Sequence, residues 1–425
     1  MKLLIITPVI PYPLDEGGKV SQFAFLEYLQ DFITIHLAVV PSSLHDLQNI
    51  SLLEKKLPKV KIHSINHIQK PVYLKKEKRK IPFYKKIYWT ITDFIFKSKN
   101  KAKKSIVVAK NTIDDFDRNL AFFNTYNRLV INNLYDLANV IQPDIIQIEH
   151  NAFLNFIEIF NKHKTIFVEH EIQFSRLLSF KNKNLSAFEK YKIEYNRTIE
   201  IALLNKYSSI LTFSHDDKEL LYQNNVNIPI EVSPFPISEF AFRKPNDDEK
   251  KINKVVFVGG SNHFPNRDAI EWYIENIAES VYHDTLLKFH IIGKCSDDLV
   301  EKYSLKSFVI FEGYVDDLQK ACINSIMVVP LRMGSGIRTK ILYGMAQELP
   351  IISTDIGCEG LGTTNSINII NANTAEEFKN KIKEIYNNPD ISNTLAENGY
   401  NFVKNNFSQK KLSERRLEIY HQLLS

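Results

Sequence analysis

The chain has 425 residues but only three cysteines, and it has no run approaching the ~20 apolar residues that a membrane-spanning helix needs. The cysteines are Cys295, Cys322 and Cys358; they lie far apart and form no C-x-x-C pair. This spacing excludes a thiolate zinc site and argues against a disulfide framework, so we expect a protein of the reducing cytoplasm. No internal repeat or low-complexity tract is evident.

A large excess of charge of one sign is also missing. Lys and Arg number 54, Asp and Glu number 49, and the net charge is +5. Charged residues make up 24% of the chain and hydrophobic residues 44%, which excludes collagen-like and disordered proteins. At the start, Met1–Ile10 is apolar but short and is interrupted by Pro8. It lacks a charged leader of any length and a small-residue cleavage site, so it predicts a buried first strand and not a signal peptide.

Short β-branched runs alternate with longer helical patterns along the chain. This alternation predicts right-handed βαβ units and mostly parallel sheets. The predicted strands are Leu3–Thr7, Ile33–Val40, Ile145–Ile148, Thr165–Val168, Ile210–Phe213, Lys254–Val258, Leu287–Ile292, Phe308–Phe311, Ile326–Pro330 and Pro350–Thr354. Helical patterns lie between them, for example at Asn266–Ile277 and Arg338–Glu348.

The length suggests two or three domains. A polar stretch that contains Pro245, Arg243–Asn253, predicts the boundary. We therefore predict an α/β protein of two doubly wound domains, residues 1–240 and 254–407, joined by a linker at 241–253. A separate helix is predicted within 408–425. Its apolar face consists of Leu412, Ile419, Tyr420 and Leu423.

A glycine pair follows the first predicted strand, in P-Y-P-L-D-E-G-G-K, Pro11–Lys19. Gly17 and Gly18 let the backbone approach a ligand closely, and the helix that follows points its N–H groups at it. This pattern suits a phosphate or a sugar. The alternative is a flexible turn between strand and helix, because a glycine pair alone is a weak signal.

A second glycine-rich loop stands in P-L-R-M-G-S-G-I-R-T-K-I-L-Y-G-M-A, Pro330–Ala346, between a predicted strand and a helix that starts near Ile337. The loop has small side chains only, at Gly334, Ser335 and Gly336. The cations around the helix start are Arg332, Arg338 and Lys340. Amides at a helix start together with three cations predict an anion site, most naturally for a diphosphate. The alternative is a solvated basic face with a simple glycine turn.

His170 follows a predicted strand, in V-E-H-E-I-Q-F-S-R, and is flanked by Glu169 and Glu171. Open α/β sheets place their sites at the carboxyl ends of strands, and the acidic neighbours could tune the imidazole. A lone histidine is more often structural, so the two interpretations stay open. Glu149–His150, after the preceding strand, is a similar case.

In order along the chain, these segments resemble the family-4 (group 1) glycosyltransferases of the GT-B fold, bacterial enzymes of surface-polysaccharide and glycoconjugate assembly. The segments that carry the resemblance are Pro11–Lys19, F-V-G-G-S-N-H-F-P-N-R-D-A-I at Phe257–Ile270, G-Y-V-D-D-L at Gly313–Leu318, G-S-G-I-R-T-K-I-L, and P-I-I-S-T-D-I-G-C-E-G-L at Pro350–Leu361. The resemblance spans nearly the whole chain and is most specific in the second half.

The resemblance implies two Rossmann-like domains that face a cleft, and transfer of a sugar from a nucleotide-sugar donor with retention of configuration. The donor would lie in the second domain and the glycan or lipid-linked acceptor mainly in the first. The last helix would cross back to the first domain. No metal or other cofactor is expected. Such an enzyme would work in the cytoplasm, with a possible peripheral place on the inner face of the cell membrane.

The resemblance also assigns residues. His170 would contact the donor sugar near the scissile bond, and Arg338 and Lys340 would hold the diphosphate as charge develops on the leaving group. Further donor-binding residues would be Gly17, Gly18, Gly334, Ser335, Gly336, Tyr343 and, through the backbone amides of their loop, Glu359, Gly360 and Leu361.

The sequence departs from the family at two glutamates that normally stand eight positions apart, because Ser335 and Tyr343 occupy those places. A tyrosine makes one hydrogen bond to a ribose where a carboxylate makes two. An Arg and a Lys of the family are also missing near Ser261 and Asn266. Two alternatives therefore stay open: a degenerate, non-catalytic glycosyltransferase-like binding protein, and a nucleotide-sugar epimerase.

The segment Lys75–Lys110 is basic and aromatic, with 13 Lys or Arg against Glu77 and Asp93. Its apolar helical stripe consists of Tyr84, Ile87, Tyr88, Ile91 and Ile95. A basic amphipathic helix of this kind indicates contact with a membrane surface. The alternative is a solvated helix packed on the first domain. A nucleic-acid partner is not expected, because no recognition motif accompanies the basic residues.

Overall fold

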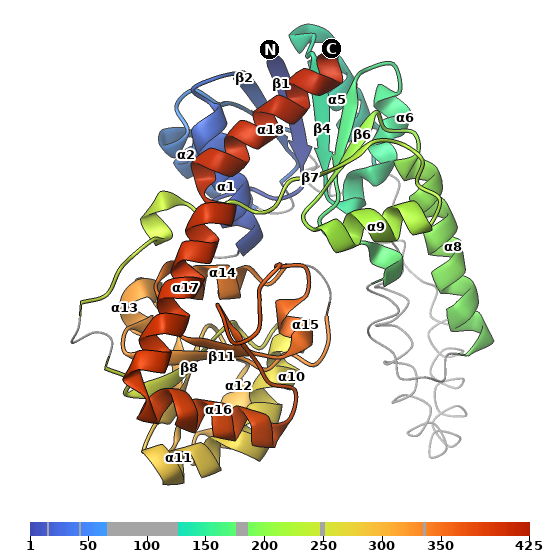
Figure 1. Ribbon diagram of the computed structural model, residues 1–425. Coiled ribbons are helices and arrows are strands. Elements are labelled where there is room, and N and C mark those ends of the chain that lie inside the picture. Colours follow the sequence, from blue (N-terminus) through green and yellow to red (C-terminus); the bar gives the residue numbers. More distant parts are fainter. Residues whose placement is uncertain (15–16, 42–43, 66–125, 176–185, 247–250, 335–336) are drawn as a thin grey trace, which may run out of the picture.

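The computed structural model describes residues 1–14, 17–41, 44–65, 126–175, 186–246, 251–334 and 337–425. Lys75–Lys110, Ser335 and Gly336 lie outside the described residues, so the predictions made for them are not tested. The described chain forms two α/β domains, one above the other in Figure 1, each built on a fully parallel sheet. This architecture confirms the predicted fold class.

The first sheet has seven strands in the order β3-β2-β1-β4-β5-β6-β7. Its strands are β1 (Lys2–Thr7), β2 (Thr34–Val39), β3 (Lys61–Ser64), β4 (Ile145–Glu149), β5 (Thr165–Val168), β6 (Ser209–Thr212) and β7 (Ile230–Val232). The central strands β1 and β4 are almost continuously apolar and buried, as strands covered on both faces must be. Every strand predicted in this half is present. The edge strands β3 and β7 were not predicted, since each is short and only partly buried.

The second sheet has six strands in the order β10-β9-β8-β11-β12-β13. Its strands are β8 (Lys254–Val258), β9 (Lys288–Ile292), β10 (Val309–Gly313), β11 (Ser325–Val329), β12 (Ile351–Ser353) and β13 (Ile370–Asn371). Every strand predicted in this half is present too, and the sequence pattern missed only the two-residue edge strand β13. In both sheets the strand order reverses beside the first strand, between β1 and β4 and between β8 and β11. Ligands of open α/β sheets bind at such reversals, outside the carboxyl ends of the strands.

Helices cover both faces of each sheet (Figure 1). In the first domain they are α1 (Gly17–Leu29), α2 (Leu44–Lys56), α5 (Arg128–Ile141), α6 (Ile157–Phe160), α8 (Ala187–Leu204) and α9 (His215–Gln223). In the second they are α10 (Phe264–Tyr273), α11 (Glu279–Thr285), α12 (Asp297–Tyr303), α13 (Leu318–Cys322), α14 (Thr339–Ala346), α15 (Asp355–Cys358), α16 (Ala375–Asn387) and α17 (Pro389–Phe407). A single π-helical turn, Ile274–Ala278, joins α10 to α11. Asp317 caps α13 by accepting a hydrogen bond from the amide of Lys320.

The last helix, α18 (Gln409–Leu424), leaves the second domain and packs against α1 of the first, so both chain termini lie at the same end of the molecule (Figure 1). The crossing point is Ser408, which has an extended backbone and pairs with Ile237. Just beyond it, Gln409 Nε2 donates to the carbonyl of Ala24. The two segments that connect the domains, at Ile237 and at Ser408, therefore lie side by side.

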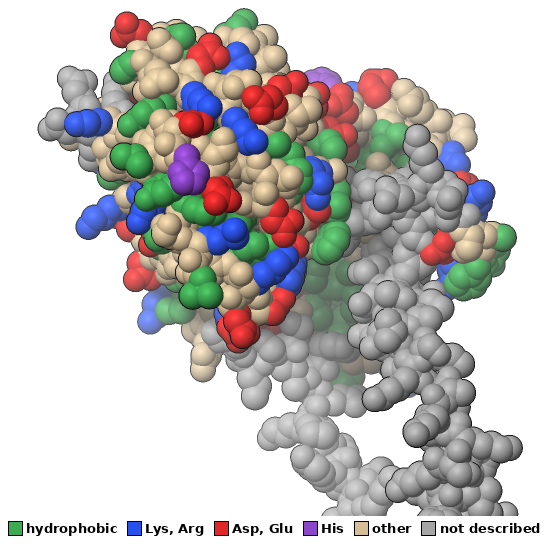
Figure 2. Space-filling model, turned by 90° about the horizontal axis from the view of Figure 1, so that it is seen from below, with side chains coloured by type: hydrophobic (Ala, Val, Ile, Leu, Met, Phe, Trp, Pro, Cys, Tyr) green, Lys and Arg blue, Asp and Glu red, His purple; other side chains and the backbone are tan. Residues whose placement is uncertain are grey.

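Charge is mixed over the outer end of the second domain. Figure 2 shows Lys and Arg side chains interspersed with Asp and Glu on this face, without a large patch of one sign. Among the described residues, no helix is long and apolar enough to cross a membrane.

Candidate functional site

The side chain of Lys340 packs against the backbone beyond the carboxyl ends of β8 and β11. Lys340 Nζ, on the first turn of α14, donates to Asn266 Oδ1 at 2.8 Å and stands 4.3 Å from the centroid of the Phe257 ring. Gly259 has φ +144°, and a Cβ there would lie 2.8 Å from Lys340 Nζ and 2.7 Å from Asn266 Nδ2. Any other residue would strain the backbone here and would have to displace the ends of the Lys340 and Asn266 side chains.

Arg338, directly before α14, stands beside this lysine. A Cβ on Gly334, which has φ +109°, would lie 3.2 Å from Arg338 Nη2. Burial lowers the pKa of Arg338, while the carboxylates of Glu359 and Glu171 oppose that shift. Burial also lowers the pKa of Lys340 to about 7, and repulsion from Arg338 adds to the effect. Two cations that have lost much of their water at a helix start form a site that an anion would stabilise.

Tyr343, one turn further along α14, faces the same region. Its hydroxyl is buried and has no hydrogen-bond partner among the described residues. Burial raises the pKa of the phenol, so it stays protonated and is free to donate a hydrogen bond to a ligand. The two other residues predicted for this loop, Ser335 and Gly336, are outside the described part of the chain.

The predicted glycines outside the α14 loop lie at the start of α1 and in the loop after α15. Gly17 and Gly18 begin α1, and a Cβ on Gly18 would meet no atom within 4 Å. Gly360 has φ +73°, and its Cβ would lie 3.1 Å from Ser214 Cβ, at the start of α9 in the first domain. Gly360 therefore marks a point where the two domains touch.

The residues on either side of Gly360, Glu359 and Leu361, have different environments. Burial raises the pKa of Glu359, and the positive charge of Arg338 opposes this shift. Leu361 is only 2% exposed, and its amide donates to the carbonyl of Cys358 at 3.2 Å. The predicted backbone-amide contact from Leu361 to a donor stays a prediction, and in this structure that amide is bonded within the protein.

On the first-domain side, His170 follows β5 and lies among aromatic rings. Its ring stacks on His150, with centroids 3.7 Å apart, and meets Phe213 edge to face at 5.1 Å. Its Nε2 lies 3.4 Å from Glu149 Oε2. The carboxylate partner of His170 is thus Glu149, at the end of the neighbouring strand β4. Glu169, which precedes His170 in the chain, turns its carboxylate to the backbone, where Oε1 accepts from the amide of Glu171 at 3.1 Å.

Glu149 is itself held in place. Gln22 Nε2 donates to Oε2 at 2.7 Å, and Gln147 Nε2 donates to Oε1 at 2.6 Å. The next residue, His150, has φ +69° and ψ 140°, a conformation that side-chain-bearing residues rarely adopt. Burial lowers the pKa of His150 well below its ordinary value, so its ring is neutral. Such backbone strain is characteristic of functional sites.

Glu149, His150 and His170 offer ligand atoms within 4.8 Å of one another, so we tested the cluster as a metal site. An imidazole nitrogen binds a metal through its lone pair, which lies in the plane of the ring. The two rings are nearly parallel, 13° apart in orientation, and are stacked face to face. One ion therefore cannot lie in both ring planes, and the three residues do not fit a metal in this arrangement. That the protein needs no metal stays a prediction.

A buried carboxylate fixes the loop that follows His170. Glu200, on α8, accepts hydrogen bonds from the amides of Gln173 at 3.0 Å and Phe174 at 3.2 Å. Burial raises its pKa to about 7. Glu169 is buried nearby, and burial together with the charge of Glu200 raises its pKa well above the usual range. These acids hold the loop rather than facing the cleft, a role that the sequence pattern did not indicate.

Arg332 does not join the other two cations. Its guanidinium binds Asp268 through two hydrogen bonds, at 3.0 and 2.5 Å, and lies over the Trp272 ring of α10. The prediction that three cations converge on the start of α14 is therefore wrong for Arg332, because an acidic and an aromatic side chain of α10 hold it.

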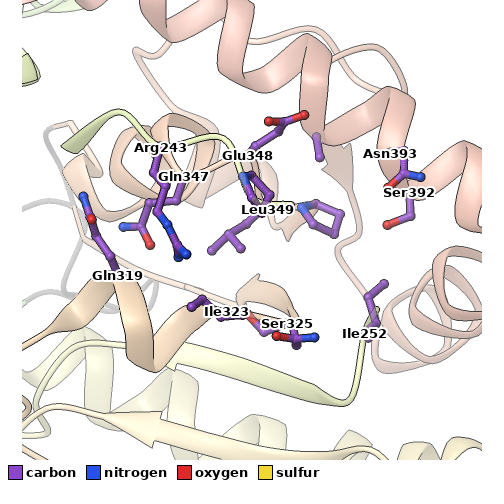
Figure 3. A pocket seen from close by; sticks show the side chains of 14 residues that line it. Arg243, Ile252, Gln319, Ile323, Ser325, Gln347, Glu348, Leu349, Ser392 and Asn393 are labelled. Atoms are coloured by element: carbon purple, nitrogen blue, oxygen red, sulfur yellow. The ribbon is translucent and has the colours of Figure 1, made fainter. Parts of the chain in front are cut away.

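A separate hollow lies on the other side of the second domain (Figure 3). Its lining includes Arg243 from the linker, Ser325 at the start of β11 and Leu349 before β12. It thus opens at the amino ends of the strands. Because ligands of this architecture bind outside the carboxyl ends, we place the site at the interdomain cleft instead.

Comparison with known proteins identifies similar sequences and similar structures. Residues 252–388 match the family model of the group 1 glycosyl transferases. An uncharacterised 44.6 kDa protein in the cps region of Klebsiella pneumoniae is 21% identical over 97% of both chains. An uncharacterised glycosyltransferase of Methanocaldococcus jannaschii is 26% identical over 69% of this chain and 78% of its own.

Solved structures share the arrangement of both domains. The Anabaena protein HepE, crystallised in complex with UDP and glucose, superposes with a TM-score of 0.66 over 99% of this chain and 100% of its own, at 10% identity. This likeness confirms the predicted GT-B fold. Over residues 252–388, in the second domain, the sequence is also similar to the group 1 glycosyl transferases.

Proposed function

We propose that the protein is a retaining glycosyltransferase that moves a sugar from a nucleotide-diphosphate sugar to a glycan or lipid-linked acceptor in surface-polysaccharide or glycoconjugate synthesis. The observation that carries the proposal is the convergence of Arg338 and Lys340 on the start of α14, at the strand reversal of the second domain. The UDP and glucose of the HepE complex and the cps-region relative support the donor class and the setting.

In the proposed reaction, the diphosphate of the donor lies at the start of α14. The guanidinium of Arg338 and the ammonium of Lys340 neutralise the charge that grows on the leaving diphosphate as the glycosidic bond breaks. Lys340 is held before the donor arrives by its hydrogen bond to Asn266, and Arg338 lies close to Gly334. The transition state has oxocarbenium character, and no covalent step on the protein is required.

His170 faces the donor sugar from the first domain in this proposal. Glu149 accepts from its Nε2–H, so Nδ1 is left as the acceptor of the ring. The hydrogen bond to the Glu149 carboxylate thus selects the tautomer of His170 that carries its proton on Nε2. Tyr343 would donate its one hydrogen bond to the nucleoside in place of the glutamate that the family usually has. Membrane contact through Lys75–Lys110 is part of the proposal for lipid-linked acceptors.

The experiment incubates the purified protein with a panel of nucleotide sugars, with and without a membrane lipid extract. Release of the nucleoside diphosphate with a glycosylated product of retained anomeric configuration is the expected result. Inverted configuration contradicts the retaining mechanism. A changed sugar in the incubation without lipid supports the epimerase alternative, and no reaction with any donor supports the non-catalytic one.

A further inference from the structure

The C-terminal helix reaches the site through buried side chains. Tyr420, on α18, is 1% exposed, and its hydroxyl donates to Gln147 Oε1 at 2.5 Å. The amide nitrogen of the same glutamine donates to Glu149 Oε1 at 2.6 Å, and the other oxygen of Glu149 lies 3.4 Å from His170 Nε2. One continuous chain of polar groups therefore joins the last helix to the imidazole that faces the cleft.

The fold alone does not require these polar residues. Gln147 and Glu149 lie on β4, in the middle of the first sheet, where they alternate with Ile146 and Ile148 and are 2% and 4% exposed. Central parallel strands are normally apolar throughout, because a buried polar group is costly unless each of its atoms is bonded. Here both ends of the Gln147 amide are bonded, and Tyr420 supplies the bond at the end far from the site.

Contacts of Arg416 fix the position of α18 on the first domain. Arg416, one turn before Tyr420, donates from Nε to Ser233 Oγ at 2.6 Å and stacks over the Phe25 ring at 4.1 Å. A small hollow remains between these residues and His170; it is lined by Gln22, Gln147, Glu149, Arg416 and Tyr420, among others. The way α18 packs on the first domain therefore determines where the Tyr420 hydroxyl lies.

We infer that Tyr420 is a positioning residue: through Gln147 it orients the carboxylate of Glu149, which in turn selects the Nε2–H tautomer and the ring orientation of His170. The inference rests on the proposed role of His170. Without the Tyr420 hydroxyl, the Gln147 amide has no donor at Oε1 and is free to rotate, so the bond to Glu149 weakens. The imidazole then populates its other tautomer and other orientations.

The test is Tyr420→Phe, which keeps the buried ring and removes one hydroxyl. Tyr28→Phe is the matched control, because Tyr28 OH also bonds across the α1–α18 interface, to Glu414 Oε1 at 3.0 Å, but does not reach Glu149. Gln147→Met, which keeps the side-chain length and removes both bonds, is the second variant in case Tyr420→Phe does not fold.

The first readout is the ring tautomer of His170, measured by nitrogen NMR of the full chain labelled at histidine and assigned with His170→Asn. We expect the Nε2–H form in wild type and in Tyr28→Phe, and a mixture in Tyr420→Phe and Gln147→Met. The second readout is sugar transfer, for which kcat falls about tenfold or more in the same two variants while KM for the donor changes little. A wild-type tautomer in both variants overturns the inference even if transfer is never observed, so its failure is distinguishable from failure of the proposed function.

Discussion

The two sides of the cleft differ in how their charges are balanced. On the first-domain side, the Glu149 carboxylate receives hydrogen bonds from Gln22 and Gln147 and contacts His170. On the second-domain side, burial lowers the pKa values of both Arg338 and Lys340. The first side is thus complete without a ligand, whereas the second would be stabilised by an anion. The difference supports the proposal that the second domain binds the charged donor and that the first positions the reacting group.

The largest effect is expected from removing the cations. Arg338→Ala or Lys340→Ala should lower sugar transfer by about 10²- to 10³-fold each, because a preorganised group that stabilises the leaving diphosphate is lost. Thermal unfolding should show that the fold survives. Arg332→Ala is the control, since this arginine is bonded to Asp268 and should leave transfer nearly unchanged. Near-normal transfer by both cation variants would contradict the assignment.

Removing the imidazole tests the other side of the cleft. His170→Ala should lower kcat by about 10²-fold, as expected for a positioned group at the reacting centre. The affinity for the nucleoside diphosphate should fall much less, because the diphosphate is held by the second domain. Steady-state kinetics and calorimetry separate the two quantities. Unchanged turnover would remove His170 from the site.

The charge state of Lys340 makes donor binding depend on pH. Its pKa of about 7 in the free protein is lowered by burial, and a bound diphosphate stabilises the ammonium and raises that pKa. Above pH 7, binding must therefore take up a proton, and affinity should fall by up to about tenfold per pH unit.

Calorimetry at pH 8 in buffers of different ionisation enthalpy measures this uptake, which should approach about one proton. Lys340→Arg is the matched variant, because arginine stays charged throughout this range. Equal proton uptake by wild type and Lys340→Arg would assign the uptake to another group.

The smallest effect concerns stability on the first-domain side. Burial raises the pKa of Glu200 to about 7, so its ionised form carries a penalty that is fully present above pH 7. The penalty disappears as the pH falls toward the ordinary carboxyl pKa. The free energy of unfolding should therefore rise as the pH is lowered from 8 to 6, by about 1 kcal/mol.

Glu200→Gln should reduce this pH dependence, as measured by urea unfolding at the two pH values. Glu194→Gln, an exposed acid on the same helix, is the control and should leave the dependence as in wild type. If stability in wild type falls between pH 8 and pH 6, the buried acid is not the group that determines this dependence.

The sequence predicted much of the fold because its strands are short, apolar and separated by clear helical patterns. It missed β3, β7 and β13, which lie at sheet edges and bury too few side chains to show a pattern. The proximity of Arg338 and Lys340 was predictable because they stand two positions apart beside a glycine loop.

The contacts that orient the site were not predictable, since they join residues far apart in sequence. Asn266 lies 74 positions before Lys340, and Gln147 lies 273 positions before Tyr420. Neither pair follows a local spacing rule. The contact between Glu149 and His170 was not predicted for the same reason, because the pairing of β4 with β5 brings Glu149 to the ring.

The most direct test of the donor site is calorimetric binding of uridine, guanosine, cytidine, adenosine and thymidine diphosphates to the full chain, with Arg338→Ala and Lys340→Ala measured alongside wild type. We expect one nucleotide to bind selectively to wild type and both variants to bind it much more weakly. Absence of binding by every nucleotide, with the protein folded and lipid present, would contradict the account and favour a non-catalytic, partner-binding protein.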